Sequence, residues 1–161
     1  MTDPAQSPAA FHFDDLEVGA TFRTDTVTVT ADEIKAFAQR YDPQPFHLDE
    51  AAARSSVFGE LVASGWLTAS LTMRLLVGTK PGPAGGWIGL GVDHLKWPQP
   101  VRPGDRLTAN CEVTAKRLSR TSPDKGVIQL RLTTCNQAGE AVLLMTTNVL
   151  VRRQVPLPSD P

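Results

Sequence analysis

The sequence has few of the residues that bind metals or form redox centres. It contains two cysteines and three histidines, and none of them shows the spacing of a structural metal site. Cys111 and Cys135 stand in strand-like stretches, so we expect two buried thiols and no metal. Neither sign of charge is in excess, with 16 basic and 17 acidic residues. Without a basic patch, nucleic acid is not an expected partner.

Long hydrophobic runs and a secretion signal are also missing. Residues 1–10 lack the basic start and apolar core of a signal peptide. The most apolar stretch, Leu61–Val77, contains Arg74 and is shorter than the roughly 20 residues that cross a bilayer. We therefore expect a soluble, cytoplasmic protein with no membrane partner.

The length of 161 residues suits one domain. Small residues, polar residues and prolines at the two ends predict a flexible arm over residues 1–10 and a flexible tail over 156–161. A single domain over residues 11–155 remains. Its 41% hydrophobic and 20% charged composition is typical of a folded protein.

Helix signals concentrate in the first half of the chain. After a strand-like stretch over residues 22–29, Thr30 and Glu33 form a capping box that predicts a helix to about Arg40. Asp49 can cap a second short helix that ends near Ala53. A long helix is predicted from near Ser64 to Gly78, and its apolar residues lie almost all round it. Such a helix is normally buried on most sides.

The second half of the chain reads as strands. Apolar residues alternate over residues 88–92, 107–115, 128–132 and from 142 to about 152, with turn residues between them. One strand, then helices, then four strands in meander-like succession indicates an α+β fold. The simplest packing wraps a curved antiparallel sheet around the long helix.

Asp42 and His47 are the first candidates for chemistry. Pro43 and Pro45 lie between them, so we expect a non-helical segment that turns both side chains toward one cleft. A carboxylate beside an imidazole can move protons near neutral pH. Spacing alone also fits a capping aspartate and a surface histidine in a proline-rich turn.

Ser64 and Gly65 open the long helix, where backbone N–H groups are unpaired and the helix dipole is positive. A thioester carbonyl at this end would be polarised, and a developing enolate would be stabilised. Gly65 would let a ligand approach the backbone closely. The plainer alternative is a helix cap followed by a packing glycine.

Three segments resemble one family in the same order. They are residues 41–49 (YDPQPFHLD), 58–71 (FGELVASGWLTASL) and 97–105 (WPQPVRPGD). The first is similar to the hydratase motif of the MaoC-like, (R)-specific enoyl-CoA hydratase family, the second to its central helix and the third to a later turn. The resemblance spans about residues 13–151. It implies a hot-dog fold, a homodimer or dimer of dimers, and no cofactor beyond an acyl-CoA or acyl-carrier thioester as substrate.

The resemblance also assigns roles to single residues. Asp42 would activate water, and His47 would exchange the proton at the α-carbon of a trans-2-enoyl thioester. An amide at Ser64 or Gly65 would hold the thioester oxygen. Ser70 matches a family serine near the catalytic pair, unless it is only a small residue that allows close packing. The expected product is an (R)-3-hydroxyacyl thioester.

Gln44 departs from the family, which commonly has asparagine there to help place the water. The amide is kept on a longer side chain, and a shift of about 1 Å can lower a rate strongly. Two other functions stay open. One is a hot-dog acyl-CoA thioesterase, whose reaction also needs a polarised carbonyl and a base, and the other is a non-catalytic acyl-thioester-binding subunit, which Gln44 would fit. Trp66, Met73 and Trp87 are bulky enough to shorten an acyl tunnel, which favours a short or unusual acyl group.

Overall fold

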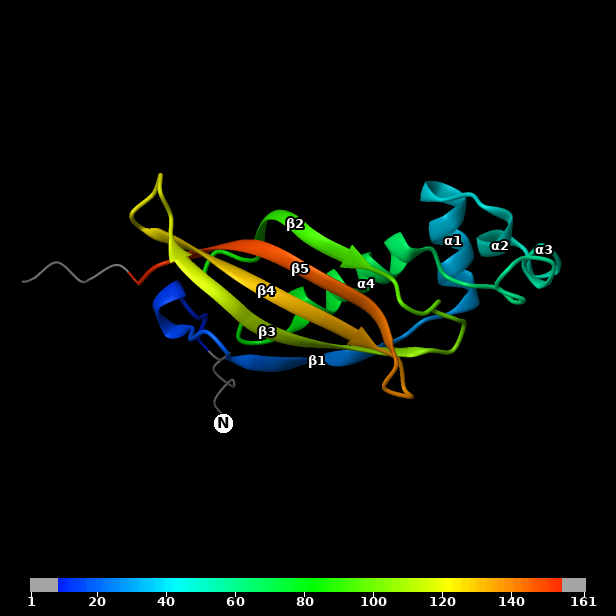
Figure 1. Ribbon diagram of the computed structural model, residues 1–161, viewed down its shortest axis with the longest axis horizontal. Coiled ribbons are helices and arrows are strands. Elements are labelled where there is room, and N and C mark those ends of the chain that lie inside the picture. Colours follow the sequence, from blue (N-terminus) through cyan, green and yellow to red (C-terminus); the bar gives the residue numbers. More distant parts are fainter. Residues whose placement is uncertain (1–8, 155–161) are drawn as a thin grey trace, which may run out of the picture.

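A computed structural model describes residues 9–154. One strand and three short helices precede a long helix, and four strands follow it (Figure 1). Most of the predicted arm and all of the predicted tail fall in residues 1–8 and 155–161, outside the described residues. In chain order, the elements are the 3₁₀ turn η1 (Phe13–Asp15), β1 (Thr21–Thr28), α1 (Ala31–Tyr41), α2 (Pro45–Leu48), α3 (Glu50–Arg54), α4 (Gly65–Gly78), β2 (Ile88–Lys96), β3 (Arg106–Leu118), β4 (Lys125–Cys135) and β5 (Ala141–Arg152).

The strands form one antiparallel sheet in the order β1-β3-β4-β5-β2. β3, β4 and β5 are a meander, with Val113 opposite Leu130 and Leu130 opposite Thr147. The expected meander of four strands is wrong for β2, which pairs with β5 at the far edge of the sheet. The connection over residues 97–105 carries the chain across the sheet to β3, and alternation within a strand cannot reveal its neighbours.

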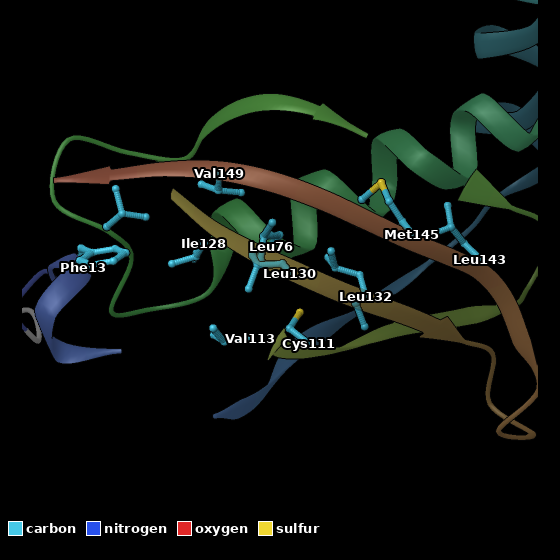
Figure 2. Close-up of a cluster of buried hydrophobic side chains, with 12 residues drawn as sticks. Phe13, Leu76, Cys111, Val113, Ile128, Leu130, Leu132, Leu143, Met145 and Val149 are labelled. Carbon is cyan, nitrogen blue, oxygen red and sulfur yellow. The ribbon is translucent and has the colours of Figure 1, made fainter. Parts of the chain in front are cut away.

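α4 lies against the inner face of the sheet, which confirms the predicted α+β hot-dog arrangement (Figure 1). Figure 2 shows buried side chains from β3, β4 and β5 gathered around Leu76 of α4. Thr72 of α4 and Thr134 of β4 share a buried hydrogen bond of 2.8 Å between their hydroxyls. A second buried cluster joins α4 to α1 and to the loop after β2, through Leu67, Leu71, Leu75, Ile34 and Val101.

The three short helices group at one end of the sheet, beside the first turn of α4 (Figure 1). The predicted N-caps are confirmed: the Thr30 hydroxyl accepts the Glu33 N–H at 3.1 Å, and Asp49 accepts the Ala52 N–H at 2.7 Å. Of the capping box predicted for Thr30 and Glu33, the first of these hydrogen bonds is the half that the structure shows. These caps fix where α1 and α3 begin. α1 and α3 therefore occupy the positions that the sequence assigns to them.

The segment over residues 42–47 corrects one expectation. It was expected to be non-helical, yet Pro45 is the first residue of α2. Proline suits that position, because the N–H it lacks would have no partner in the helix and its fixed φ is already helical. His47 therefore stands on a helical turn, where it is 5% exposed.

One face of α4 and nearly all of β2 are left uncovered by residues 9–154. On α4 the exposed apolar residues are Trp66, Met73 and Val77, so the predicted burial holds only for the side toward the sheet. On β2 they are Ile88, Leu90 and Val92, each about half exposed. Among the described helices, none is long and apolar enough to span a membrane.

Candidate active site

Asp42 and His47 meet beside the first turn of α4. Asp42 ends α1, and its N–H donates to the Ala38 carbonyl at 2.9 Å. His47 stands on α2, and its Nε2 lies 3.4 Å from Oδ2 of Asp42. The turn between α1 and α2 thus brings together the two side chains that the sequence singled out.

A backbone carbonyl sets the orientation of the His47 ring. Nδ1 of His47 lies 2.7 Å from the Val62 oxygen. Because a carbonyl only accepts hydrogen bonds, Nδ1 must carry a proton. Nε2 then faces Asp42, where it is an acceptor in the neutral ring and a donor in the imidazolium. The ring can therefore exchange its Nε2 proton without turning.

The surroundings of Asp42 keep its carboxyl group ionised. Hydrogen bonding with the Ser64 hydroxyl lowers the pKa of Asp42 most, and burial partly opposes this effect. The Gln44 amide and the charge of His47 lower the pKa further. Gln44 Nε2 donates to Oδ1 of Asp42 at 2.8 Å, so the longer amide side chain holds the carboxylate directly. Each carboxylate oxygen thus has a neighbouring nitrogen, the Gln44 amide for one and His47 Nε2 for the other.

Ser64 connects this carboxylate to α4. Its hydroxyl oxygen accepts the Trp66 N–H at 3.2 Å, which makes Ser64 the N-cap, and the residue is fully buried. Within residues 9–154, the N–H of Gly65 donates to no carbonyl or side chain. A free N–H in the first turn of a helix is a donor for an oxygen that gains negative charge.

The loop after β2 closes the other side of the site. The Ala63 N–H donates to the Val101 carbonyl at 2.8 Å, which ties the start of α4 to this loop. Asp105 supports the loop by accepting the Arg102 N–H at 2.8 Å and the Gln137 amide at 2.9 Å. The proline-glycine-aspartate turn therefore positions the site and lies outside its chemistry.

These elements enclose an open cavity of about 500 Å³. Asp42, Gln44, His47 and Gln99 supply its charged and amide groups, and Gly65 is among its lining residues. The remaining lining is largely apolar and aromatic, with Phe46, Phe58, Trp66 and Trp97 among its residues. An apolar cavity with a few converging polar groups is typical of a small-molecule site.

Comparison with known proteins places the chain in a family. The model of the MaoC-like domain matches residues 15–134. This chain is a member of the MaoC-like domain family.

Named relatives cover most of the MaoC-like domain. An (R)-specific enoyl-CoA hydratase of Rhodospirillum rubrum is 31% identical over 87% of this chain and 91% of that protein. An (R)-specific enoyl-CoA hydratase of Aeromonas caviae is 35% identical over 85% of this chain and 95% of that protein. The crystal structure of a MaoC-like dehydratase from Rhodospirillum rubrum superposes with a TM-score of 0.86, at 48% identity, over 92% of this chain and 100% of that chain.

Ser70 is the predicted site residue that the MaoC-like domain does not bring to the cavity. It lies on the exposed face of α4, where its hydroxyl donates to the Trp66 carbonyl at 2.8 Å. Asp42, Gln44, His47 and Gly65 line the cavity, and Ser64 lies behind it. The predicted group therefore assembles in one protomer except for this serine.

Sequence reasoning missed two features of the MaoC-like domain. The Val62 carbonyl has no side-chain signal, because any residue could supply it. Trp97 covers Gly65, and a Cβ on that glycine would lie 2.6 Å from Cε2 of Trp97. The glycine was a signal of close approach, and the partner that approaches in the described chain is this indole.

Two further groups of the MaoC-like domain add no chemistry to the cavity. Burial raises the pKa of the Cys111 thiol to about 12, so it is not a nucleophile at neutral pH. Cys135 is partly buried, and the two cysteines are free thiols. Within residues 9–154, no cluster of three or more His, Cys, Asp or Glu side chains could hold a metal ion.

Proposed function

We propose that this protein catalyses the reversible hydration of a trans-2-enoyl thioester to an (R)-3-hydroxyacyl thioester. One observation carries the proposal: Nε2 of His47 and Oδ2 of Asp42 lie 3.4 Å apart, with Nδ1 of His47 fixed on the Val62 carbonyl. Two groups that exchange protons side by side suit the addition of water across a double bond. The named (R)-specific hydratases support the reaction class and its stereochemistry.

The proposed step starts from the Asp42 carboxylate and the His47 imidazolium. Water in the cavity gives one proton to Asp42 while its oxygen bonds to the β-carbon. The electrons of the double bond shift toward the thioester oxygen, which the Gly65 N–H stabilises. Nε2 of His47 then gives its proton to the α-carbon. A proton passes from Asp42 to Nε2 of His47, which restores both groups.

The low pKa of Asp42 has a place in this step. A carboxylate held ionised by Ser64 and Gln44 is ready to accept a proton at neutral pH. The same contacts fix the oxygen that faces His47. The proposed step uses no metal or redox group. Its substrate is an acyl-CoA or acyl-carrier thioester.

The test is a crotonyl-CoA assay that follows loss of the enoyl absorbance together with release of free thiol. The proposal predicts loss of the enoyl group with no thiol release, and an (R)-3-hydroxybutyryl product on chiral analysis. Thiol release with the double bond intact would instead establish a thioesterase. Binding without turnover would establish an acyl-thioester-binding subunit.

The exposed apolar surface of β2 supports a homodimer, alone or within a dimer of dimers. β2 is an edge strand with Ile88, Leu90 and Val92 each about half exposed. Exposed apolar edge strands favour pairing with another chain. Light scattering should give twice the monomer mass or a multiple of it, and Leu90→Lys should shift the mass toward the monomer. A monomeric wild-type protein would contradict this proposal.

A further inference from the structure

Two tryptophans stand directly beside the N–H that would hold the thioester oxygen. The Trp97 indole rests on Gly65, where a Cβ would lie 2.6 Å from Cε2 and 2.8 Å from Cδ2 of the ring. Trp66 meets Trp97 edge to face, with ring centroids 5.4 Å apart and an interplanar angle of 76°. Both rings line the cavity that holds Asp42 and His47. The two indoles therefore limit the space next to the reacting atoms.

Beyond the cavity, exposed apolar residues continue along the side of α4 that carries Trp66. Met73 and Val77 follow Trp66 at intervals of seven and eleven residues, which places them on the same side of the helix. They are 40% and 49% exposed. An acyl chain gains by covering such a surface, whereas the amide groups of a pantetheine arm gain more from water. A lengthening acyl chain would thus have to pass Trp66.

Resting on the proposed function, we infer that Trp66 and Trp97 limit the acyl group to short chains and are the length-determining residues of this protein. Each indole occupies volume that the additional methylenes of a longer chain need. The edge-to-face contact fixes both rings, because movement of one would break its packing on the other. Trp87, expected from the sequence to block the tunnel, packs instead on Phe11 and Phe22, and it is not a lining residue of the cavity.

The test compares kcat/KM on crotonyl-CoA and trans-2-decenoyl-CoA for the wild type, Trp66→Ala and Trp97→Ala. A buried methylene is worth about 0.8 kcal/mol, or about fourfold in affinity. Each substitution should raise the decenoyl-to-crotonyl ratio about tenfold or more, and wild type should favour crotonyl. Trp87→Phe is the matched control and should leave the ratio unchanged. Trp66→Phe and Trp97→Phe should give smaller increases, and they serve if an alanine variant does not fold.

A binding measurement separates this inference from the hydratase proposal. Calorimetry with butyryl-CoA and decanoyl-CoA, which cannot be hydrated, should show the same shift toward the longer chain in the two alanine variants. An unchanged chain-length ratio in folded variants would overturn the inference, as would equal losses on both chain lengths or a wild-type preference for decenoyl. If the wild type hydrates no enoyl thioester, the hydratase proposal fails while this binding comparison still decides the role of the tryptophans.

Discussion

Replacing Ser64 with alanine removes one hydroxyl that serves two groups. Its oxygen accepts the Trp66 N–H at the start of α4, and hydrogen bonding with it lowers the pKa of Asp42. Loss of a helix N-cap costs about 1 kcal/mol. Loss of the hydrogen bond to Asp42 costs about 0.5–1.5 kcal/mol, because its side chain is 20% exposed and water can partly replace the hydroxyl. We expect Ser64→Ala to lower the free energy of unfolding by about 2 kcal/mol at pH 7.

The pH dependence separates the two effects. A carboxyl whose pKa is lowered by folding contributes stability above its unfolded value, here 3.8, and loses it as the pH falls through the folded value. The Asp42 part of the Ser64→Ala effect should therefore decrease as the pH falls below 3.8 toward the folded pKa of Asp42. The cap part should remain, because the Trp66 N–H does not titrate.

Urea denaturation from about pH 7 down to about pH 3 would measure both parts. A thermal melt at pH 7 gives a second measure. The melting temperature of Ser64→Ala should fall by about 4–8 °C, because about 1 kcal/mol corresponds to about 2–4 °C for a protein of this size. Thr30→Ala is the matched control, since Thr30 caps α1 at the end away from Asp42. It should lose about 1 kcal/mol at every pH. A Ser64→Ala effect that is independent of pH and equal to that of Thr30→Ala would show that Ser64 does not stabilise the Asp42 carboxylate.

Two more predictions concern packing around α4. Gly65→Ala places a Cβ 2.6 Å from Trp97 Cε2, so it should destabilise the protein by about 1–3 kcal/mol in thermal melts. Adding Trp97→Ala to the same chain should recover part of that loss. Fully additive losses would show that the Cβ and the indole do not collide. Thr72→Val leaves the Thr134 hydroxyl without the partner that lies 2.8 Å away, so the free energy of unfolding in urea should fall by about 1–3 kcal/mol. The double variant Thr72→Val, Thr134→Val should lose clearly less, because no hydroxyl is left unpaired. A double variant that loses as much as the two single variants together would contradict this.

The helices were predictable because their signals are local. Thr30, Asp49 and Ser64 are caps that the structure confirms, and each acts on an N–H two or three residues away. α2 was missed because Pro45 was expected to prevent a helix, whereas it is the first residue of one. Local preference forbids proline inside a helix and permits it at the first position.

The candidate site was predictable in most of its polar members, Ser70 excepted, and less so in geometry. Asp42 and His47 come together as expected, but the position of the His47 ring depends on the carbonyl of Val62, which no side chain announces. Position 65 has no room for a side chain, because the Trp97 ring lies against it. Such contacts join segments far apart in the sequence, and composition and spacing do not fix them. For the same reason, alternation along β2 predicted a strand but not its place beside β5.

Gln44 shows how a departure from a family pattern can be compatible with the site. The sequence raised the concern that the longer amide would misplace water. In the structure, its Nε2 donates to Oδ1 of Asp42 at 2.8 Å and helps to lower the pKa of that carboxyl. The Gln44 amide thus reaches one carboxylate oxygen, and Oδ2 faces His47.

The most direct test of the account is hydration of crotonyl-CoA by Asp42→Asn beside the wild type. The substitution keeps the shape of the side chain and removes the base, so kcat/KM should fall by about 10²-fold or more. Affinity for butyryl-CoA should change little, and Glu50→Gln, which breaks only the exposed ion pair with Lys35, should hydrate at the wild-type rate. If Asp42→Asn hydrates crotonyl-CoA as fast as the wild type, Asp42 is not the base and the proposed mechanism is wrong.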